Sequence, residues 1–120
     1  QAKKEFSKGE KQKAIDLLKL VIDRHSDSSN EFNPLVTAAK TRLCRIYISQ
    51  KDYQEVLNTL SNSDVLTASL LELKGDAENQ LGLYELARVS YMRALQNSPS
   101  QTSRTLINMK ISNLEGEKIE

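Results

Sequence analysis

The sequence predicts an all-α fold in which short helices pack as hairpins, and three observations lead to that class. Apolar residues recur three and four positions apart along most of the chain, and no β-branched run alternates with polar residues as a half-buried strand does. Polar breaks are few, and Pro34 and Pro99 both lie in or beside them. Aromatic residues make up only 5% and Trp is absent, which is typical of a core built from Leu and Ala.

Three helical segments are predicted in the N-terminal half. Lys11 to Arg24 carries an apolar stripe, and Gly9 is expected to form a left-handed turn that separates this stripe from a helix-like Gln1 to Ser7. A polar break from Arg24 to Asn33 follows. The next two segments, each with apolar residues at helical spacing, are Leu35 to Gln50 and Tyr53 to Leu60.

Three more segments are predicted in the C-terminal half. Asp64 and Ser100 can each cap the first turn of a helix, and Gly82 suits a left-handed turn between two helices. Connections of two or three residues within a pair force the two helices into an antiparallel hairpin. The segments are Val65 to Leu81, Leu83 to Leu95 and Gln101 to about Glu115.

Length and charge exclude several classes of protein. The 120 residues predict a single domain spanning 1–120. With 17 Lys or Arg against 16 Asp or Glu, the net charge of +1 is not that of a nucleic-acid binder. No apolar run approaches the ~18–20 residues of a membrane-spanning helix. Because the chain starts at Gln1 without a signal-peptide pattern, we interpret it as a fragment from which targeting information has been removed.

An internal repeat relates the hairpins to one another. Tyr53 and Tyr84 follow equivalent turns and lie 31 residues apart, close to the ~34-residue tetratricopeptide period. With Ala68 as the first position of its unit, the Leu, Gly, Ala, aromatic, Ala and Pro places of that motif hold Leu71, Gly75, Ala87, Tyr91, Ala94 and Pro99. The chain therefore resembles a tetratricopeptide repeat protein. This resemblance implies an α-α superhelix of about two and a half helix hairpins plus a C-terminal capping helix.

Close helix packing explains the small residues of this motif. Gly75 and Ala87 are expected where the two helices of one hairpin approach each other, and Ala94 where the next helix crosses. An apolar stripe on the final helix can cover the open edge of the last hairpin: Leu106, Ile107, Ile111 and Leu114. Its polar residues are expected to face water: Lys110, Asn113 and Glu115.

A closer resemblance covers roughly Thr37 to Leu114. The residues that carry it are Leu73-Lys74-Gly75-Asp76, Gly82, Ala87-Arg88, Tyr91 to Leu95, Pro99 and Met109-Lys110-Ile111-Ser112-Asn113-Leu114. These runs are similar to the YfgM family of bacterial inner-membrane proteins, with the final helix the most specific part. The resemblance implies a single membrane anchor upstream of this fragment and a domain on the periplasmic side of the inner membrane. It further implies an ancillary role at the Sec translocon, with the translocon and a PpiD-like membrane-anchored chaperone as partners. An unrelated cytoplasmic tetratricopeptide scaffold is the alternative.

Tetratricopeptide proteins bind ligands on the concave surface that the first helix of each pair lines. The repeat register assigns to that face Thr41, Arg45, Ile48, Ser49, Glu72, Asp76, Asn79 and Gln80. With Arg45 facing Glu72 and Asp76, the surface would be polar and of mixed charge, which suits a partner peptide. A solvated helix face without a ligand is the alternative interpretation.

Residues that could support catalysis have simpler explanations. Glu72 and Asp76 lie four positions apart on one helical face, where an exposed like-charged pair costs only a few tenths of a kcal/mol. Cys44 falls within an apolar stripe and is expected to be a buried, inert thiol. His25, the single histidine, is expected to be exposed at a helix end or to interact with the helix dipole. We therefore predict no enzyme activity, no cofactor and no metal site.

The N-terminal edge of the stack is a candidate for self-association. Because the first unit retains little of its first helix, its second helix would expose Leu17, Leu20 and Val21. A second copy of the chain could cover these residues, so we expect a homodimer at high concentration.

Overall fold

Six helices account for nearly all of the chain that the structure describes. The computed structural model describes residues 2–25, 33–61, 66–98 and 100–119, and side chains within 9–114 of these ranges. No strand occurs in these ranges, and the predicted all-α class is confirmed. The helices are α1 (Ala2–His25), α2 (Pro34–Ser49), α3 (Tyr53–Leu60), α4 (Ala68–Gln80), α5 (Tyr84–Asn97) and α6 (Gln101–Ile119). No helix in the described part of the chain is both long and apolar enough to cross a membrane.

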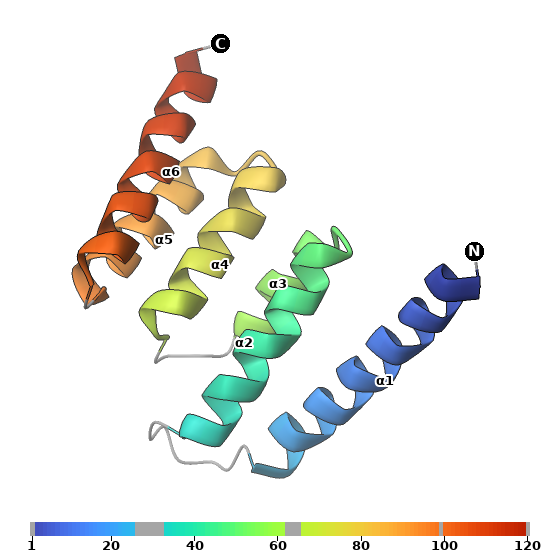
Figure 1. The fold of residues 1–120 in the computed structure, drawn as a ribbon. Coiled ribbons are helices and arrows are strands. Elements are labelled where there is room, and N and C mark those ends of the chain that lie inside the picture. The colour runs from blue at the N-terminus through green and yellow to red at the C-terminus, as the bar shows by residue number, and fades with distance from the viewer. Residues whose placement is uncertain (1, 26–32, 62–65, 99, 120) are drawn as a thin grey trace.

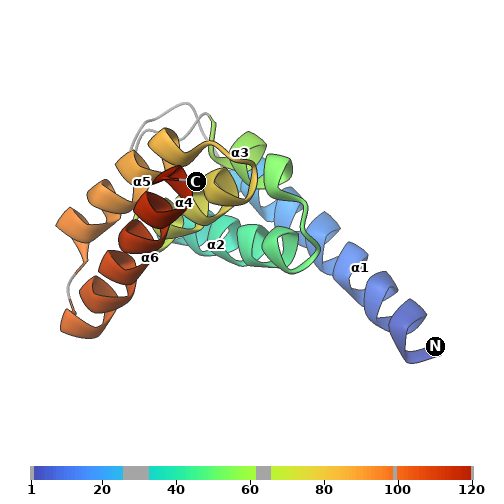
Figure 2. The same cartoon turned by 90° about the horizontal axis from the view of Figure 1, so that it is seen from above.

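The helices form a curved stack of two layers. Helices α1, α2, α4 and α6 lie side by side in one layer, with α3 and α5 behind them (Figure 1). α2 pairs with α3 and α4 with α5, and these two hairpins also contact each other through α3 and α4. Seen from above, α1 and α6 incline toward the same side, so the stack is concave there and α3 and α5 lie on the convex side (Figure 2).

Equivalent turns connect the helices of the two hairpins. Lys51 in the first turn and Gly82 in the second both adopt left-handed backbone angles, with φ of 64° and 80°. In each turn, the residue that follows donates its N–H to the carbonyl five residues earlier at 2.8 Å. The turns therefore repeat at the 31-residue spacing that the sequence indicated. Gly82 adopts this angle without strain, whereas Lys51 adopts it despite its Cβ.

α1 corrects one prediction, because it is a single uninterrupted helix from Ala2 to His25. Gly9 lies inside this helix and forms no turn. A glycine in a helix interior costs only about 1 kcal/mol relative to Ala, and the residues on both sides are strong helix formers. Ala2 to Ser7 is consequently part of α1 and not a separate first helix of the first unit. α1 stands alone as the half hairpin at the start of the stack.

Side-chain caps fix where three helices begin. Asn33 Oδ1 accepts the N–H of Leu35 at 3.0 Å, with Pro34 in the first turn of α2. Ser100 Oγ accepts the N–H of Ser103 at 3.1 Å, so the predicted cap of α6 is confirmed. α4 begins at Ala68 rather than Val65, because Thr67 is its N-cap.

Two other predictions about helix ends fall outside the described residues. These are the cap assigned to Asp64 and the helix-stopping role of Pro99. α5 ends at Asn97, two residues before that proline. The helix therefore extends two residues beyond the predicted end at Leu95.

Two apolar clusters make the core, one on each side of α4. The first joins α1, α2, α3 and α4 and contains Ile15, Leu43, Cys44, Tyr47, Val56, Leu60, Leu70 and Ala77. The second joins α4, α5 and α6 and contains Leu71, Ala87, Tyr91, Ala94, Ile107 and Leu114. Because α4 contributes to both clusters, it connects the two halves of the stack.

The small residues of the repeat motif are buried as predicted. Gly75 lies against the ring of Tyr91, and a Cβ built on it would come within 2.6 Å of Tyr91 Cε1. Ala87 and Ala94 are completely buried on α5, between α4 and α6. Close approach between α4 and α5 therefore depends on the absence of a side chain at position 75.

α6 covers the last hairpin with only part of its predicted stripe. Ile107 and Leu114 are buried against α4 and α5, and Ile111 packs beside them. Leu106 was expected in this contact but is exposed, because it lies one position away from the buried Ile107 on the helix. Asn113 faces water as predicted, while the side chain of Glu115 lies outside the described residues.

Candidate functional site

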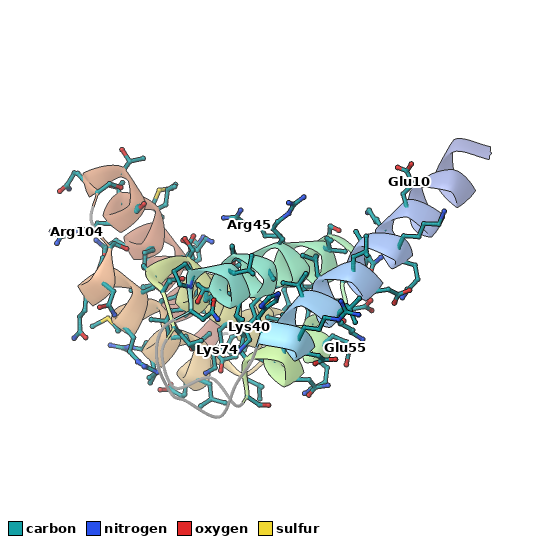
Figure 3. All side chains as sticks on the ribbon, turned by 90° about the horizontal axis from the view of Figure 1, so that it is seen from below. Glu10, Lys40, Arg45, Glu55, Lys74 and Arg104 are labelled. Atoms are coloured by element: carbon teal, nitrogen blue, oxygen red, sulfur yellow. The ribbon has the colours of Figure 1, made fainter. Side chains whose placement is uncertain are left out.

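The predicted binding residues come from α2 and α4, the first helices of the two hairpins. Their α2 members lie on the helix that lines the concave side of the stack (Figure 2). Arg45 is exposed and projects from α2 into the open side between α1 and α6 (Figure 3). Arg45 is therefore accessible to a partner on the concave side.

The remaining α2 members differ in what their side chains can offer a partner. Thr41 is half-buried, and its hydroxyl donates to the carbonyl of Thr37 at 2.8 Å. Ile48 is half-buried and packs against the first apolar cluster. Ser49 is exposed; its hydroxyl donates to the carbonyl of Ile46 at 2.7 Å and accepts from Lys11 Nζ at 3.5 Å. Arg45 is consequently the strongest polar group on this face.

Lys110 of α6 engages the two predicted acidic residues of α4. Its amine lies 2.7 Å from Glu72 Oε2 and 3.0 Å from Asp76 Oδ1. Lys110 was expected to face water, but its side chain is only 34% exposed and its ammonium lies between two carboxylates. Among the described residues, Lys110 rather than Arg45 is the cation that pairs with Glu72 and Asp76. Arg45, which was expected to face these carboxylates across a groove, makes no ion pair with them in the described part of the chain.

Tyr91 ties the same carboxylates to α5. Its hydroxyl donates to Asp76 Oδ1 at 2.5 Å, and Lys110 Nζ lies 5.9 Å from the centre of its ring. Burial raises the pKa of the Tyr91 phenol, and the bond to Asp76 raises it further. For Lys110, burial lowers the pKa, but the bonds to Glu72 and Asp76 outweigh this and leave it above the ordinary value. We call Glu72, Asp76, Tyr91 and Lys110 the α6 anchor.

The last two predicted residues lie at the end of α4. Gln80 is exposed, whereas Asn79 is half-buried and its Oδ1 is buried without a hydrogen-bond partner. Gln80 is therefore the more accessible of the two to a partner.

A buried carboxylate on α4 was missed by the sequence analysis. Glu78 is almost completely buried, and it accepts from Ser90 Oγ at 2.6 Å and from Lys74 Nζ at 3.2 Å. The four-residue spacing of Lys74 and Glu78 is visible in the sequence, but nothing in that spacing indicates burial against α5. These bonds satisfy the carboxylate within the hairpin. Glu78 therefore has a structural role.

Cys44 and His25 behave as the sequence indicated. Cys44 is fully buried in the first apolar cluster, and burial raises the pKa of its thiol to about 12. A thiol in that state is a poor nucleophile at neutral pH. His25 is exposed at the last residue of α1. In the part of the chain that the structure describes, no group of three His, Cys, Asp or Glu residues could hold a metal ion.

Most of the exposed large apolar side chains in the described residues lie on α1, α5 and α6. At the α1 end, Leu17 is 64% exposed and Leu20 is 45% exposed, while Val21 is half-buried. The prediction of an exposed apolar edge on this helix is thus confirmed for two of its three residues. At the other end, the largest exposed side chains of α5 and α6 are Leu86, Val89, Met92, Leu106 and Met109.

Comparison with known proteins agrees with this architecture. The family model described as "Tetratricopeptide repeat-like domain" matches residues 1–116, nearly the whole chain. No curated protein and no solved structure matches the chain.

Proposed function

We propose that this chain, which belongs to the tetratricopeptide repeat-like family, binds a partner protein on its concave side. Domains of this family are generally non-catalytic interaction scaffolds. The observation that carries the proposal is Arg45, which projects from α2 into the concave side of the stack (Figure 3). A curved layer of helices presents several residues to one extended segment of a partner, which is how repeat proteins bind.

The partner class follows from the resemblance to the YfgM family. We propose that the chain is the periplasmic domain of a YfgM-like protein that is anchored upstream in the inner membrane. In this role it assists the Sec translocon and links it to periplasmic chaperones, including a PpiD-like membrane-anchored one. The runs around Gly75 and from Met109 to Leu114 support this assignment.

An unrelated cytoplasmic tetratricopeptide scaffold has the same fold and remains the second candidate. The full gene sequence separates the two. A stretch of about 20 apolar residues encoded upstream of Gln1 is expected for the membrane-anchored protein. A gene without such a stretch would rule out the YfgM-like role and favour the scaffold.

Site-specific photo-crosslinking in membranes tests the binding surface. A photoreactive side chain replaces Ser49 on α2 in one variant and Gln54 on α3 in the control, since both residues are exposed and α3 lies on the convex side. Crosslinked products are probed with antibodies against the translocon and the chaperone. We expect products from position 49 and few from position 54. Equal yields from both positions would contradict a concave binding surface.

The charge of the concave side gives a second test. Arg45→Glu should lower crosslinking from position 49 without changing the helical circular dichroism spectrum, because Arg45 is exposed and makes no ion pair with a described residue. Glu72 is unsuitable for such a reversal, since it holds Lys110 at 2.7 Å and its replacement would also loosen α6. If crosslinking from position 49 is unchanged in Arg45→Glu, the partner binds a surface that does not include Arg45.

We further propose that a second copy of the chain covers the outer face of α1. Leu17 and Leu20 lie three positions apart on that helix, so both belong to one exposed ridge. Sedimentation velocity at several concentrations is the test. We expect a dimer at high concentration and a monomer for Leu17→Lys. A wild-type monomer at every concentration would refute self-association.

A further inference from the structure

The charged residues of α2 are all basic. Its sequence contains Lys40, Arg42 and Arg45, and no Asp or Glu. No acidic neighbour three or four positions away on this helix can therefore neutralise the arginines, although such pairs are common on helix surfaces. Arg42 and Arg45 are both exposed and lie three positions apart, so they share one face of α2. Since Arg45 projects into the concave side, this shared face is directed there (Figure 3).

The described carboxylates of the neighbouring hairpin have partners other than these arginines. Glu72 and Asp76 are held by Lys110, and Glu78 is buried against Ser90. Among the described residues, no ion pair to an acidic side chain involves Arg42 or Arg45. The protein as a whole is nearly neutral, at +1, so the positive charge here is local to α2. A local positive charge of this kind attracts the negatively charged groups of a partner.

An apolar section lies on the same face of α2, toward its N-terminus. Leu35 is 51% exposed and Ala38 is also exposed, and both continue the spacing of Arg42 and Arg45. At 1.5 Å per residue, Leu35 lies about 10 Å from Arg42 and about 15 Å from Arg45 along the helix axis. An extended peptide covers that span with three to five residues at about 3.3 Å each.

We propose that the concave face of α2 binds an acidic, extended segment of a partner protein. This proposal rests on the binding function proposed above. Two carboxylates of the segment pair with Arg42 and Arg45, whose planar guanidinium groups can each bind a carboxylate through two parallel hydrogen bonds. A large apolar residue, three to five positions away in the segment, packs on Leu35 and Ala38. The two arginines determine which segments bind, and the apolar contact determines their orientation along α2.

Fluorescence anisotropy with a defined probe tests this proposal. The probe is a labelled extended peptide with one Leu followed, after three neutral residues, by Glu, one neutral residue and Asp, so that the Leu and both acids point to the same side of the extended chain. Its control replaces the acids with Gln and Asn. We expect the folded chain to bind the acidic probe and not the neutral one, and the affinity to fall as salt screens the charges. Absence of binding to the acidic probe at millimolar chain concentration would overturn the proposal. A single-stranded oligonucleotide that bound in its place would also overturn it.

Charge-matched variants assign the binding to α2. Arg42→Gln with Arg45→Gln removes two exposed positive charges from α2, and Arg93→Gln with Arg104→Gln removes two from α5 and α6. We expect at least a tenfold loss of affinity for the first pair and less than twofold for the second, with unchanged circular dichroism in both. Equal losses would show a net-charge effect and contradict a site on α2.

The same α2 variant distinguishes failure of this proposal from failure of the binding function. If crosslinking of a partner protein from position 49 persists in Arg42→Gln/Arg45→Gln, the concave side binds a protein, but not through these arginines. If crosslinking from position 49 is absent in the wild type as well, the concave binding function fails with the proposal.

Discussion

Replacing Gly75 by Ala sets two opposing effects against each other. Alanine favours a helix over glycine by about 0.5–1 kcal/mol, so the change would stabilise α4 if space were available. The added Cβ, however, would lie 2.6 Å from Cε1 and 2.7 Å from Cδ1 of Tyr91. Carbon atoms pack at about 3.5–4.0 Å, so either the ring or the helix must move.

The ring of Tyr91 has little freedom to move. It is buried in the second apolar cluster, and its hydroxyl donates to Asp76 at 2.5 Å. Overpacking of a core costs about 1–3 kcal/mol. The clash with Tyr91 is severe because the ring atoms lie so close to the added Cβ, so we place Gly75→Ala in the upper part of that range. After the helix propensity gain is subtracted, the free energy of unfolding should fall by about 1–2 kcal/mol. For a chain of this size, that corresponds to a decrease in Tm of about 4–8 °C.

Gly9→Ala is the matched control, because Gly9 is also helical and a Cβ there would meet no atom within 4 Å. It should raise the free energy of unfolding by up to about 1 kcal/mol. The assay is urea unfolding followed by circular dichroism at 222 nm. If Gly75→Ala stabilises the protein as much as Gly9→Ala does, then α4 and α5 do not approach as closely as described. The explanation of the small motif residues would fail with that result.

The remaining predictions concern the turns, the α6 anchor and the buried thiol. Gly82→Ala should lower the free energy of unfolding by about 1 kcal/mol, because position 82 has a φ of 80°; equal Tm values for both proteins would contradict this. Lys110→Met should destabilise the protein by about 1–2 kcal/mol in urea unfolding, since it leaves two half-buried carboxylates without their cation. The control Arg104→Met, at an exposed position of α6, should cost less than about 0.5 kcal/mol. The pKa values of Lys110 and Tyr91 are raised in the folded state, so their stabilising contributions are present below pH ~10 and are lost as the pH rises further. The raised pKa of Cys44, about 12, adds a loss that starts near pH 9, and Cys44→Ala should remove this part of the alkaline sensitivity. A thiol reagent at pH 8 should label Cys44 only as fast as the protein opens; rapid labelling of the folded protein would show that the thiol is accessible.

Local signals in the sequence predicted the hairpins well. Gly82 indicated a turn because glycine readily adopts the left-handed backbone angle that this turn has. The 31-residue spacing then identified the equivalent turn at Lys51. Ala87 and Ala94 were recognised as contact positions because a repeat motif encodes helix packing at fixed places. These features depend on short-range chain geometry, which a sequence displays directly.

Long-range contacts were predicted less well. Lys110 is polar and was assigned to solvent, but its partners lie 34 and 38 residues away on α4. The burial of Glu78 likewise depends on α5, which the spacing of charges on α4 does not describe. Gly9 was predicted to form a left-handed turn, but the strong helix formers around it outweigh the low helix propensity of one glycine. Among the predicted site residues, Arg45 kept its expected exposure, whereas Glu72 and Asp76 are occupied by α6.

An open, curved stack of helices is the central claim, since the concave side and its arginines exist only in that shape. Small-angle X-ray scattering, extrapolated to zero concentration, measures it most directly. The structure has a Cα radius of gyration of 15.4 Å. A compact globule of this length would have about 13.6 Å. We predict a value at or slightly above 15.4 Å for the monomer. A value near 13.6 Å would indicate a closed bundle and contradict the curved binding surface.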